Sequence, residues 1–403
     1  MPLCQHLLGY LDSTGHGAAG LEKALDAVLS GTGEHSSLVC AVTAQGTLRT
    51  GETPKLLQAD SGALGVQLAI SRPVQRAVEA VAANTMTSGC ILVLDTATAA
   101  VRASVSVPCY DPERLADSLQ AENSPFLNRA LQSYAVGSVF KPVLAAAALE
   151  AGLQPVFECT GAVVVDDWQI FRCAGGVPHG QVDLAAALEK SCNGYFIRLG
   201  QQLGAESLLD AAKAFGFGQS LPLAEGLAAE AGQLPAPQEL AQSGQLANFS
   251  FGQGSLLAAP MQVAALFNTI AADGVYRSPY VLQATLDETT GQPVETLSHP
   301  RGRRVISAQN AALLRAMLVQ VVQQGTAQDA AGLSGGAGGK TGTAQTGQFT
   351  PEGTEHCNLW FAGFWPAEKP RYTIVVLQDG AVHTAYSGAA IFAQVCNALE
   401  AAG

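Results

Sequence analysis

The chain has 403 residues, of which 48% are hydrophobic and 13% are charged, and its formal net charge is −12. This composition is typical of a folded protein with a sizeable core and excludes a disordered chain. No run of Lys or Arg offers a surface for nucleic acid or for an anionic membrane, so we expect no nucleic-acid partner.

Membrane and export signals are the next feature. No segment reaches the roughly 18 consecutive apolar residues of a spanning helix, and residues 1–15 lack the basic start and apolar stretch of a signal peptide. Two interpretations remain open at this point: a cytoplasmic protein, or an exported protein whose anchor or signal lies outside this sequence.

The first 60 residues are rich in glycine and irregular, with a helical pattern at 21–29 and a short strand pattern at 38–42. Denser signals follow, and we therefore predict a domain boundary near residue 62. The elements predicted next are a strand at 66–70, a helix at 73–83 and a hairpin of strands 91–95 and 101–107.

The rest of the chain alternates between helical and extended patterns. Three successive strands near the end, joined by short turns, should pair antiparallel, and the first hairpin and a closing helix should complete a layered sheet. The sequence thus predicts an α+β fold. The predicted helices are 138–150, 184–190, 193–203, 260–272, 308–322 and 388–399, and the predicted strands are 339–345, 359–365 and 372–378.

Nine cysteines are dispersed along the chain without the paired spacing of a zinc ribbon. Cys159 and Cys173 bracket a predicted hairpin that turns at Asp166 and Asp167. If the turn centres on Asp166, the two cysteines lie opposite each other, and a disulfide is geometrically feasible. Free thiols and a metal site that includes His179 are the alternatives.

A first motif, Ser138-Val-Phe-Lys141, places a hydroxyl and an amine three residues apart at a helix start. Both side chains then lie on one face and can form a hydrogen bond. The lysine can act as a base only if burial lowers its pKa enough to leave it neutral. Taken alone, the motif is equally compatible with an exposed helix start.

A second motif, Ser191-Cys-Asn193, lies between two predicted helices. In the structural interpretation, Ser191 or Asn193 is an N-cap. In the functional interpretation, Ser191 relays protons between the lysines and a leaving group, and Asn193 donates its amide to a substrate backbone.

A third motif, Lys340-Thr-Gly342 followed by Thr343, fails as a phosphate-binding loop because its glycines do not precede the lysine at the required spacing. As a strand, it alternates, so that Lys340 and Gly342 face one side and Thr341 and Thr343 face the other. Glycine would allow an extended ligand to approach closely.

The order of the three motifs is more informative than any one of them, because this triplet is characteristic of penicillin-binding proteins and related β-lactamases. The chain resembles a class B penicillin-binding protein over essentially its whole length. Further segments similar to that family are Asn128-Arg-Ala130, His179-Gly180, Gly252-Gln-Gly254, Pro260-Met-Gln262, Gly325-Thr-Ala327 and Trp360-Phe-Ala-Gly-Phe364. Ala135 and Val136 depart from the prolines often found before the first motif.

The resemblance implies the penicillin-binding protein and serine β-lactamase fold, with an antiparallel sheet packed between helices and an all-helical subdomain. Residues 1–61 would be the remnant of a non-catalytic pedestal, and 62–403 the transpeptidase domain. It also implies anchoring at the outer face of the cytoplasmic membrane, through an N-terminal segment absent from this sequence.

By resemblance, the activity is a D,D-transpeptidase that cross-links peptidoglycan stem peptides and is inhibited by β-lactams, with no cofactor and no catalytic metal. The implied catalytic residues are Ser138 as nucleophile, Lys141 as base, Ser191 as proton relay, Asn193 and Lys340. Thr341, Gly342 and Thr343 would bind substrate, and the backbone N–H groups of Ser138 and Thr343 would form the oxyanion hole. A cell-wall glycosyltransferase is a further expected partner. The alternatives are a β-lactamase or D,D-carboxypeptidase and a β-lactam sensor without turnover.

Overall fold

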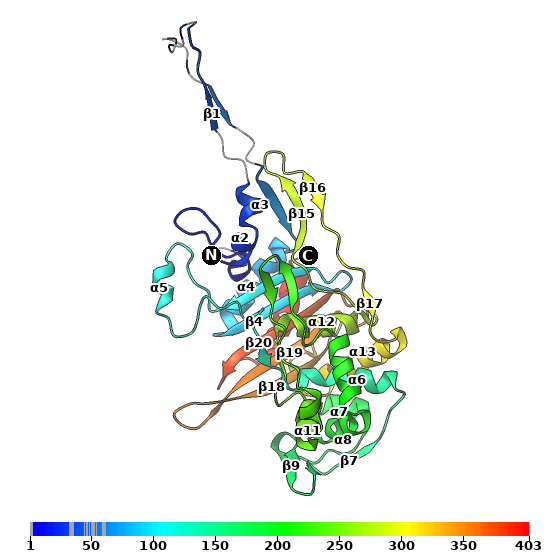
Figure 1. Cartoon of the computed structure of the whole chain (residues 1–403). Helices are drawn as coiled ribbons and strands as arrows, with labels where there is room; N and C mark the ends of the chain where they lie inside the picture. The colour runs from blue at the N-terminus through cyan, green and yellow to red at the C-terminus, as the bar shows by residue number, and fades with distance from the viewer. Residues whose placement is uncertain are drawn as a thin grey trace.

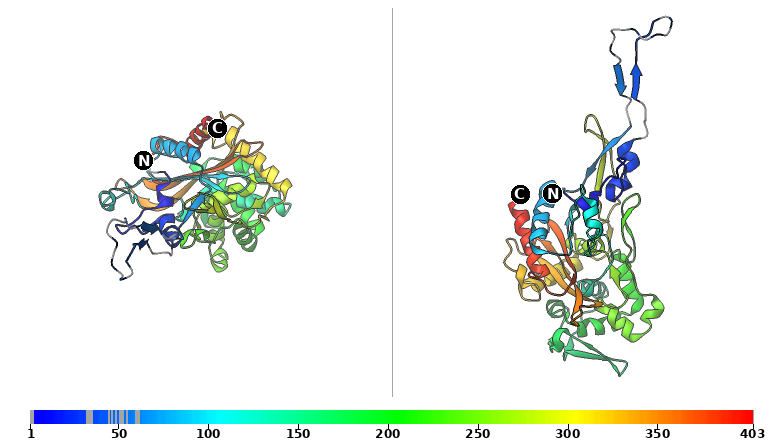
Figure 2. Two further views of the ribbon diagram at one scale, coloured as in Figure 1. Left: turned by 90° about the horizontal axis from the view of Figure 1, so that it is seen from above. Right: turned by 90° about the vertical axis from the view of Figure 1, so that its left-hand side faces the viewer.

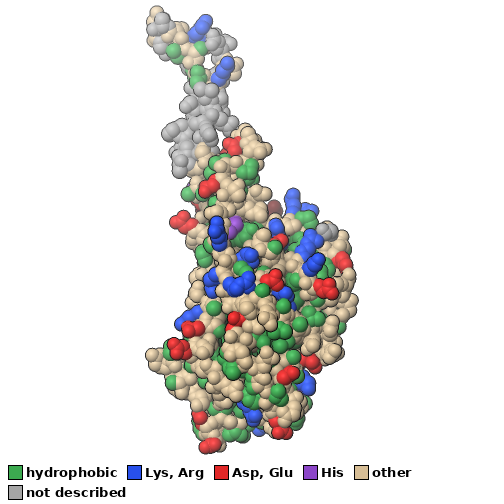
Figure 3. Space-filling model, turned by 90° about the vertical axis from the view of Figure 1, so that its right-hand side faces the viewer, with side chains coloured by type: hydrophobic (Ala, Val, Ile, Leu, Met, Phe, Trp, Pro, Cys, Tyr) green, Lys and Arg blue, Asp and Glu red, His purple; other side chains and the backbone are tan. Residues whose placement is uncertain are grey.

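The computed structural model describes residues 3–31, 36–43, 45, 47, 49, 53, 55–58 and 62–402. Among these residues, no helix combines the length and the apolar character needed to cross a membrane. On the face drawn in Figure 3, acidic side chains lie among the basic ones.

A five-stranded antiparallel sheet forms the centre of the fold, in the order β18-β19-β20-β4-β5. The predicted pairing of the last three strands with the first hairpin is therefore confirmed. Buried residues run almost without interruption along β20 and β4, because both faces of the sheet are covered. The strand bounds are β4 (Gly89–Asp95), β5 (Val101–Val107), β18 (Gly338–Phe349), β19 (Glu355–Trp365) and β20 (Tyr372–Ala381).

Helices cover both faces of this sheet, as the view from above in Figure 2 shows. On one face lie α4 (Arg72–Thr85) and α14 (Gly388–Ala401), which pack against each other and against the strands. On the other lies α12 (Pro260–Ala271), all of whose residues are buried. A helix that is apolar nearly all round fits such an internal position. The predicted α+β class and layered arrangement are confirmed.

A mostly helical subdomain lies beyond α12 and carries the first two motifs (Figure 1). Each helix predicted here is present with small shifts of its ends. Two-stranded sheets also occur, which the expectation of an all-helical subdomain did not include. The helices are α6 (Lys141–Glu150), α7 (Leu184–Glu189), α8 (Asn193–Leu203), α9 (Ala205–Ala214), α10 (Pro237–Leu240), α11 (Ser243–Ser250) and α13 (Ala308–Gln323); the short strands are β7 (Phe157–Cys159), β8 (Ala162–Val165), β9 (Gln169–Arg172), β10 (Gly180–Val182), β11 (Leu221–Ala224) and β12 (Leu227–Ala229).

The helices and strands of the first 60 residues differ more from the predicted ones than those of the rest of the chain. The helical pattern at 21–29 is split into α2 (Gly20–Ala24) and α3 (Asp26–Ser30), while α1 (Gln5–Leu8) packs near β5. The antiparallel pair β1 (Ser36–Val39) and β2 (Lys55–Gln58) extends away from the body (Figure 1). The division at residue 62 remains a prediction.

A smaller antiparallel sheet joins this end of the chain to the region after α12. It is formed by β3 (Leu64–Leu68), β15 (Leu282–Asp287) and β16 (Pro293–Thr296). The remaining elements are α5 (Leu115–Leu119), β6 (Tyr134–Ala135), β13 (Leu257–Ala258), β14 (Val275–Tyr276), β17 (Arg303–Arg304) and the short 3₁₀ helices η1 (Gly137–Phe140), η2 (Ala174–Gly176) and η3 (Gln328–Ala330).

Candidate active site

Ser138 lies in η1, a 3₁₀ turn that leads directly into α6. The turn begins at Gly137, whose φ of 60° is in the left-handed region. A Cβ at this position would lie 2.7 Å from the carbonyl oxygen of Thr343. Glycine thus allows the backbone before Ser138 to press against β18. Pro142 falls in the first turn of α6, where a missing N–H costs nothing.

The Lys141 amine is fully buried and makes three hydrogen bonds. It donates to the backbone oxygen of Ser191 at 2.8 Å, to Ser191 Oγ at 3.2 Å and to Asn193 Oδ1 at 2.7 Å. Among the described residues, no hydrogen bond joins Ser138 Oγ to Lys141 Nζ, so the direct bond considered for this pair is absent. The lysine instead links the first motif to the second.

Burial lowers the pKa of Lys141 to about 7. The nearby Cys192 and Cys173 sulfurs raise this pKa, but by less than burial lowers it. A substantial fraction of the amine is therefore neutral near neutral pH, and a neutral amine can accept a proton. Lys340 is also fully buried, and burial together with the nearby Lys141 charge lowers its pKa well below the usual value.

Ser191 stands just before α8 with a φ of 53°, an unusual backbone conformation for a residue other than glycine. The N-cap of α8 is Cys192, whose sulfur accepts a hydrogen bond from the Tyr195 N–H at 3.4 Å. The structural interpretation, in which Ser191 or Asn193 is the cap, is therefore wrong. Instead, Asn193 bridges two elements: Oδ1 accepts from Lys141, and Nδ2 donates to the Arg172 carbonyl at 2.9 Å.

The third motif lies on β18, which is an edge strand of the sheet. Its alternation is as predicted: Lys340 and Gly342 are buried, whereas Thr341 is half-buried and Thr343 is exposed. The Thr343 carbonyl accepts from Gln253 Nε2 at 3.5 Å, on the side away from β19. Because the N–H and C=O of one residue in an antiparallel strand point the same way, the Thr343 N–H also faces this open edge.

An open cleft brings the three motifs together. Ser138, Ser191, Asn193 and residues 341–343 line it, while the Lys141 and Lys340 side chains are buried beside it. Neither an aspartate nor a glutamate is among the described residues that line the cleft.

Sequence reasoning missed several lining residues. Thr326 Oγ1 lies 2.7 Å from Thr341 Oγ1, so the two hydroxyls share a hydrogen bond at the rim. Asn248, Gln253 and Lys190 also line the cleft. Thr326 and Gln253 occur in segments that resemble the family, and this resemblance could have marked them as site residues. Asn248 and Lys190 had no local pattern to mark them.

The hairpin register predicted for the cysteine pair is wrong. The β8–β9 pairs place Cys173 beside Gly161, whose carbonyl accepts the Cys173 N–H at 3.0 Å. Cys159 instead ends β7, because the chain turns at Gly161 with a φ of 90°. The two sulfurs are nevertheless 3.6 Å apart, and both cysteines are free thiols in the structure.

A pH dependence follows from the position of Lys141. If its neutral form is the base, acylation by a penicillin should speed up about tenfold per pH unit below pH 7 and level off above it. The groups that face the amine are Lys340 from β18, Cys192 at the start of α8 and Cys173 after β9. The measurement is the second-order acylation rate constant between about pH 5 and about pH 9. A rate constant that stays flat or falls as the pH rises across this range would contradict the role of Lys141 as the base. The melting temperature at each pH is the control for unfolding.

The sequence model of a protein family, the penicillin-binding protein transpeptidase domain, matches residues 89–399, which is most of the chain. The chain belongs to this family. Its resemblance to class B penicillin-binding proteins is thereby confirmed. Peptidoglycan D,D-transpeptidase PbpA of Mycolicibacterium smegmatis is 32% identical over 417 residues, covering 97% of this chain and 80% of the relative.

Solved structures agree with this assignment. Penicillin-binding protein 3 of Mycobacterium tuberculosis in complex with aztreonam matches with a TM-score of 0.80 and 29% identity, covering 99% of this chain and 88% of that one. The ceftriaxone acyl-enzyme of penicillin-binding protein A from the same organism matches with a TM-score of 0.80 and 25% identity, covering 98% and 89%.

Two other segments of this penicillin-binding protein prove to be structural. Gln262 in α12 is buried and donates to the carbonyls of Gly216, Gln219 and Ala231. Arg129 is buried and pairs with Asp379 at 2.9 Å, which fastens the segment before η1 to the end of β20. Both side chains provide hydrogen-bond partners for buried polar groups, and neither lines the cleft.

Proposed function

We propose that this transpeptidase domain forms a Ser138 acyl-enzyme with the terminal D-alanyl-D-alanine of a stem peptide and transfers the acyl group to an amine of a second stem peptide. The observation that carries the proposal is the Lys141 amine, which is buried and bonded to both Ser191 and Asn193, two residues that line the same cleft as Ser138. The relative from M. smegmatis, named a peptidoglycan D,D-transpeptidase, supports the same activity.

In the acylation step, neutral Lys141 takes the proton of Ser138 as its Oγ attacks the penultimate carbonyl carbon. The bond to the terminal D-Ala nitrogen breaks, and Ser191 donates its proton to that nitrogen while it takes up from Lys141 the proton that came from Ser138. The Ser138 and Thr343 N–H groups form the oxyanion hole; the open-edge orientation of Thr343 supports this role. One such donor typically contributes about 10²–10³ in rate.

The substrate carboxylate is assigned to Thr341 and Thr343 on the edge strand, with Lys340 behind them. An anion bound there would favour the charged form of Lys340 and offset its lowered pKa. Gly342 keeps the strand close to the first motif, since a Cβ there would lie 3.0 Å from the Val136 oxygen. Asn193 has a second amide hydrogen for the substrate backbone.

Location and partners are part of the proposal. Stem peptides lie outside the cytoplasmic membrane, so we place the domain at its outer face, tethered there by an anchor. A cell-wall glycosyltransferase remains a predicted partner, and residues 1–61 remain a predicted pedestal remnant beside the transpeptidase domain of residues 62–403.

Persistence of the acyl-enzyme tests the proposal against hydrolysis. Deacylation by water needs a base, and the cleft lining described above contains no carboxylate. We expect a fluorescent penicillin adduct to last for minutes to hours in a chase with unlabelled penicillin. Turnover within seconds would instead identify a β-lactamase or carboxypeptidase. A stable adduct without D-Ala release from a stem pentapeptide in the presence of an acceptor amine would identify a sensor.

A further inference from the structure

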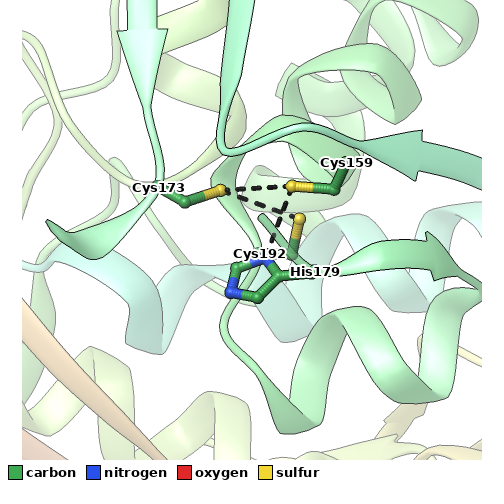
Figure 4. A group of neighbouring side chains, drawn as sticks. All are labelled: Cys159, Cys173, His179 and Cys192. Atoms are coloured by element: carbon green, nitrogen blue, oxygen red, sulfur yellow. Dashed lines mark hydrogen bonds between the residues drawn. The ribbon is translucent and has the colours of Figure 1, made fainter. Parts of the chain in front are cut away.

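Four side chains with metal-binding groups converge directly behind the second motif (Figure 4). Cys159 ends β7, Cys173 follows β9, His179 precedes β10 and Cys192 caps α8. Their ligand atoms all lie within 4.8 Å of one another. The mechanism described above uses none of them.

Three of the six distances within this group are close to the edges of a tetrahedron around one ion, and the other three are at most 4.8 Å. Cys159 Sγ lies 3.6 Å from Cys173 Sγ and 3.4 Å from His179 Nδ1, and Cys173 Sγ lies 3.8 Å from Cys192 Sγ. Zinc with bonds of about 2.3 Å to sulfur and about 2.0 Å to nitrogen places tetrahedral ligand atoms roughly 3.5–3.8 Å apart. A disulfide would need about 2.05 Å between two of these sulfurs and would leave the third thiol unused.

Ligand chemistry selects the ion. Three thiolates and one imidazole are soft to borderline ligands that suit Zn²⁺ and disfavour Mg²⁺ and Ca²⁺. All three cysteines are buried and His179 is half-buried, so a bound ion would be shielded from solvent. The Tyr195 N–H already donates to Cys192 Sγ, the kind of supporting hydrogen bond that orients a thiolate ligand.

We propose that Cys159, Cys173, His179 and Cys192 form a structural Zn²⁺ site in this domain. Each cysteine loses its thiol proton and forms a Zn–S bond, and His179 contributes a nitrogen lone pair; no electron transfer is involved. Four protein ligands complete the tetrahedron and leave no position for water or substrate, which distinguishes a structural site from a catalytic one. The ion ties β7, the β8–β9 hairpin and β10 to the start of α8.

The zinc also positions the second motif, a consequence that rests on the proposed function. Cys192 stands between Ser191 and Asn193, the two residues that hold the Lys141 amine. Ser191 has the left-handed φ of 53°, and a Zn–S bond at the next residue would hold that backbone in place. Cys192 is thus a positioning residue for the proton relay.

Metal content of the full chain, purified from zinc-supplemented medium, tests the site. We expect about one zinc per chain by elemental mass spectrometry, largely lost in Cys173→Ser. The matched control is Cys396→Ser, which alters an equally buried cysteine in α14 and should retain the zinc. Wild-type protein without zinc, or zinc retained in Cys173→Ser, would overturn the proposal.

Cobalt provides a second test that does not depend on how the variant folds. Co²⁺ exchanged into the wild-type chain should give the intense visible bands of tetrahedral coordination together with sulfur-to-cobalt charge transfer. A weak octahedral spectrum, or an intact mass showing a disulfide in place of metal, would reject the site.

Acylation kinetics test the positioning role separately. Zinc removed with a chelator should lower the acylation rate constant of folded protein by about 10-fold or more, and added Zn²⁺ should restore it. An unchanged rate constant would reject the positioning role of Cys192, but it would not contradict the zinc site itself. Zinc-loaded protein that never acylates would count against the proposed function and not against the metal site.

Discussion

Ser138→Ala is expected to abolish covalent labelling by penicillin while leaving the fold intact. The variant removes the only atom proposed to bond to the β-lactam carbonyl carbon, and loss of a serine nucleophile elsewhere costs on the order of 10⁶ in rate. Ser138 is half-buried in η1, so deleting its hydroxyl leaves no large cavity. The measurement is the intact mass after incubation with penicillin, together with the melting temperature.

A matched serine separates chemistry from stability. Ser387 is exposed and caps α14 by accepting from the Ala390 N–H at 3.1 Å. Ser387→Ala should therefore cost about 1 kcal/mol of stability and still label fully. Labelling of folded Ser138→Ala at another residue would show that the nucleophile is misassigned.

Lys141→Met is expected to slow acylation by about 10²–10⁴, the usual contribution of a positioned general base. Methionine matches the apolar stem of lysine and removes the cost of burying a charge, but it leaves Ser191 and Asn193 without their shared donor. These effects on stability oppose each other, so we expect the melting temperature to change by less than about 5 °C. The observed acylation rate should fall far more than this small change could explain.

Two further variants sharpen this prediction. Lys141→Arg keeps a cation but stays protonated at all accessible pH values, so it should be slow and lose the pH dependence predicted above. Lys213→Met alters an exposed lysine on α9 and should acylate at the wild-type rate. Fast acylation by either Lys141 variant would exclude this lysine as the base.

Segments whose local pattern matched their tertiary environment could be predicted from the sequence. α8 begins and ends where its periodicity predicts, and β4 with β5 forms the expected hairpin. The region at 21–29 was harder, because its short apolar pattern does not reveal the break at Leu25. Hairpin register also failed: the pair of Val165 with Gln169 centres the turn on Asp167, so Cys173 lies opposite Gly161 and not opposite Cys159.

The sequence alone was sufficient for the family, the three motifs and the order of helices and strands around them, because these depend on residue type and short-range periodicity. Only the tertiary structure determined which atoms meet. It joined Lys141 to Ser191 and Asn193 rather than to Ser138, and it brought four metal-binding side chains from separate elements behind Cys192. Burial of Lys141, which lowers its pKa, likewise arises from helices and a strand that are distant in the chain.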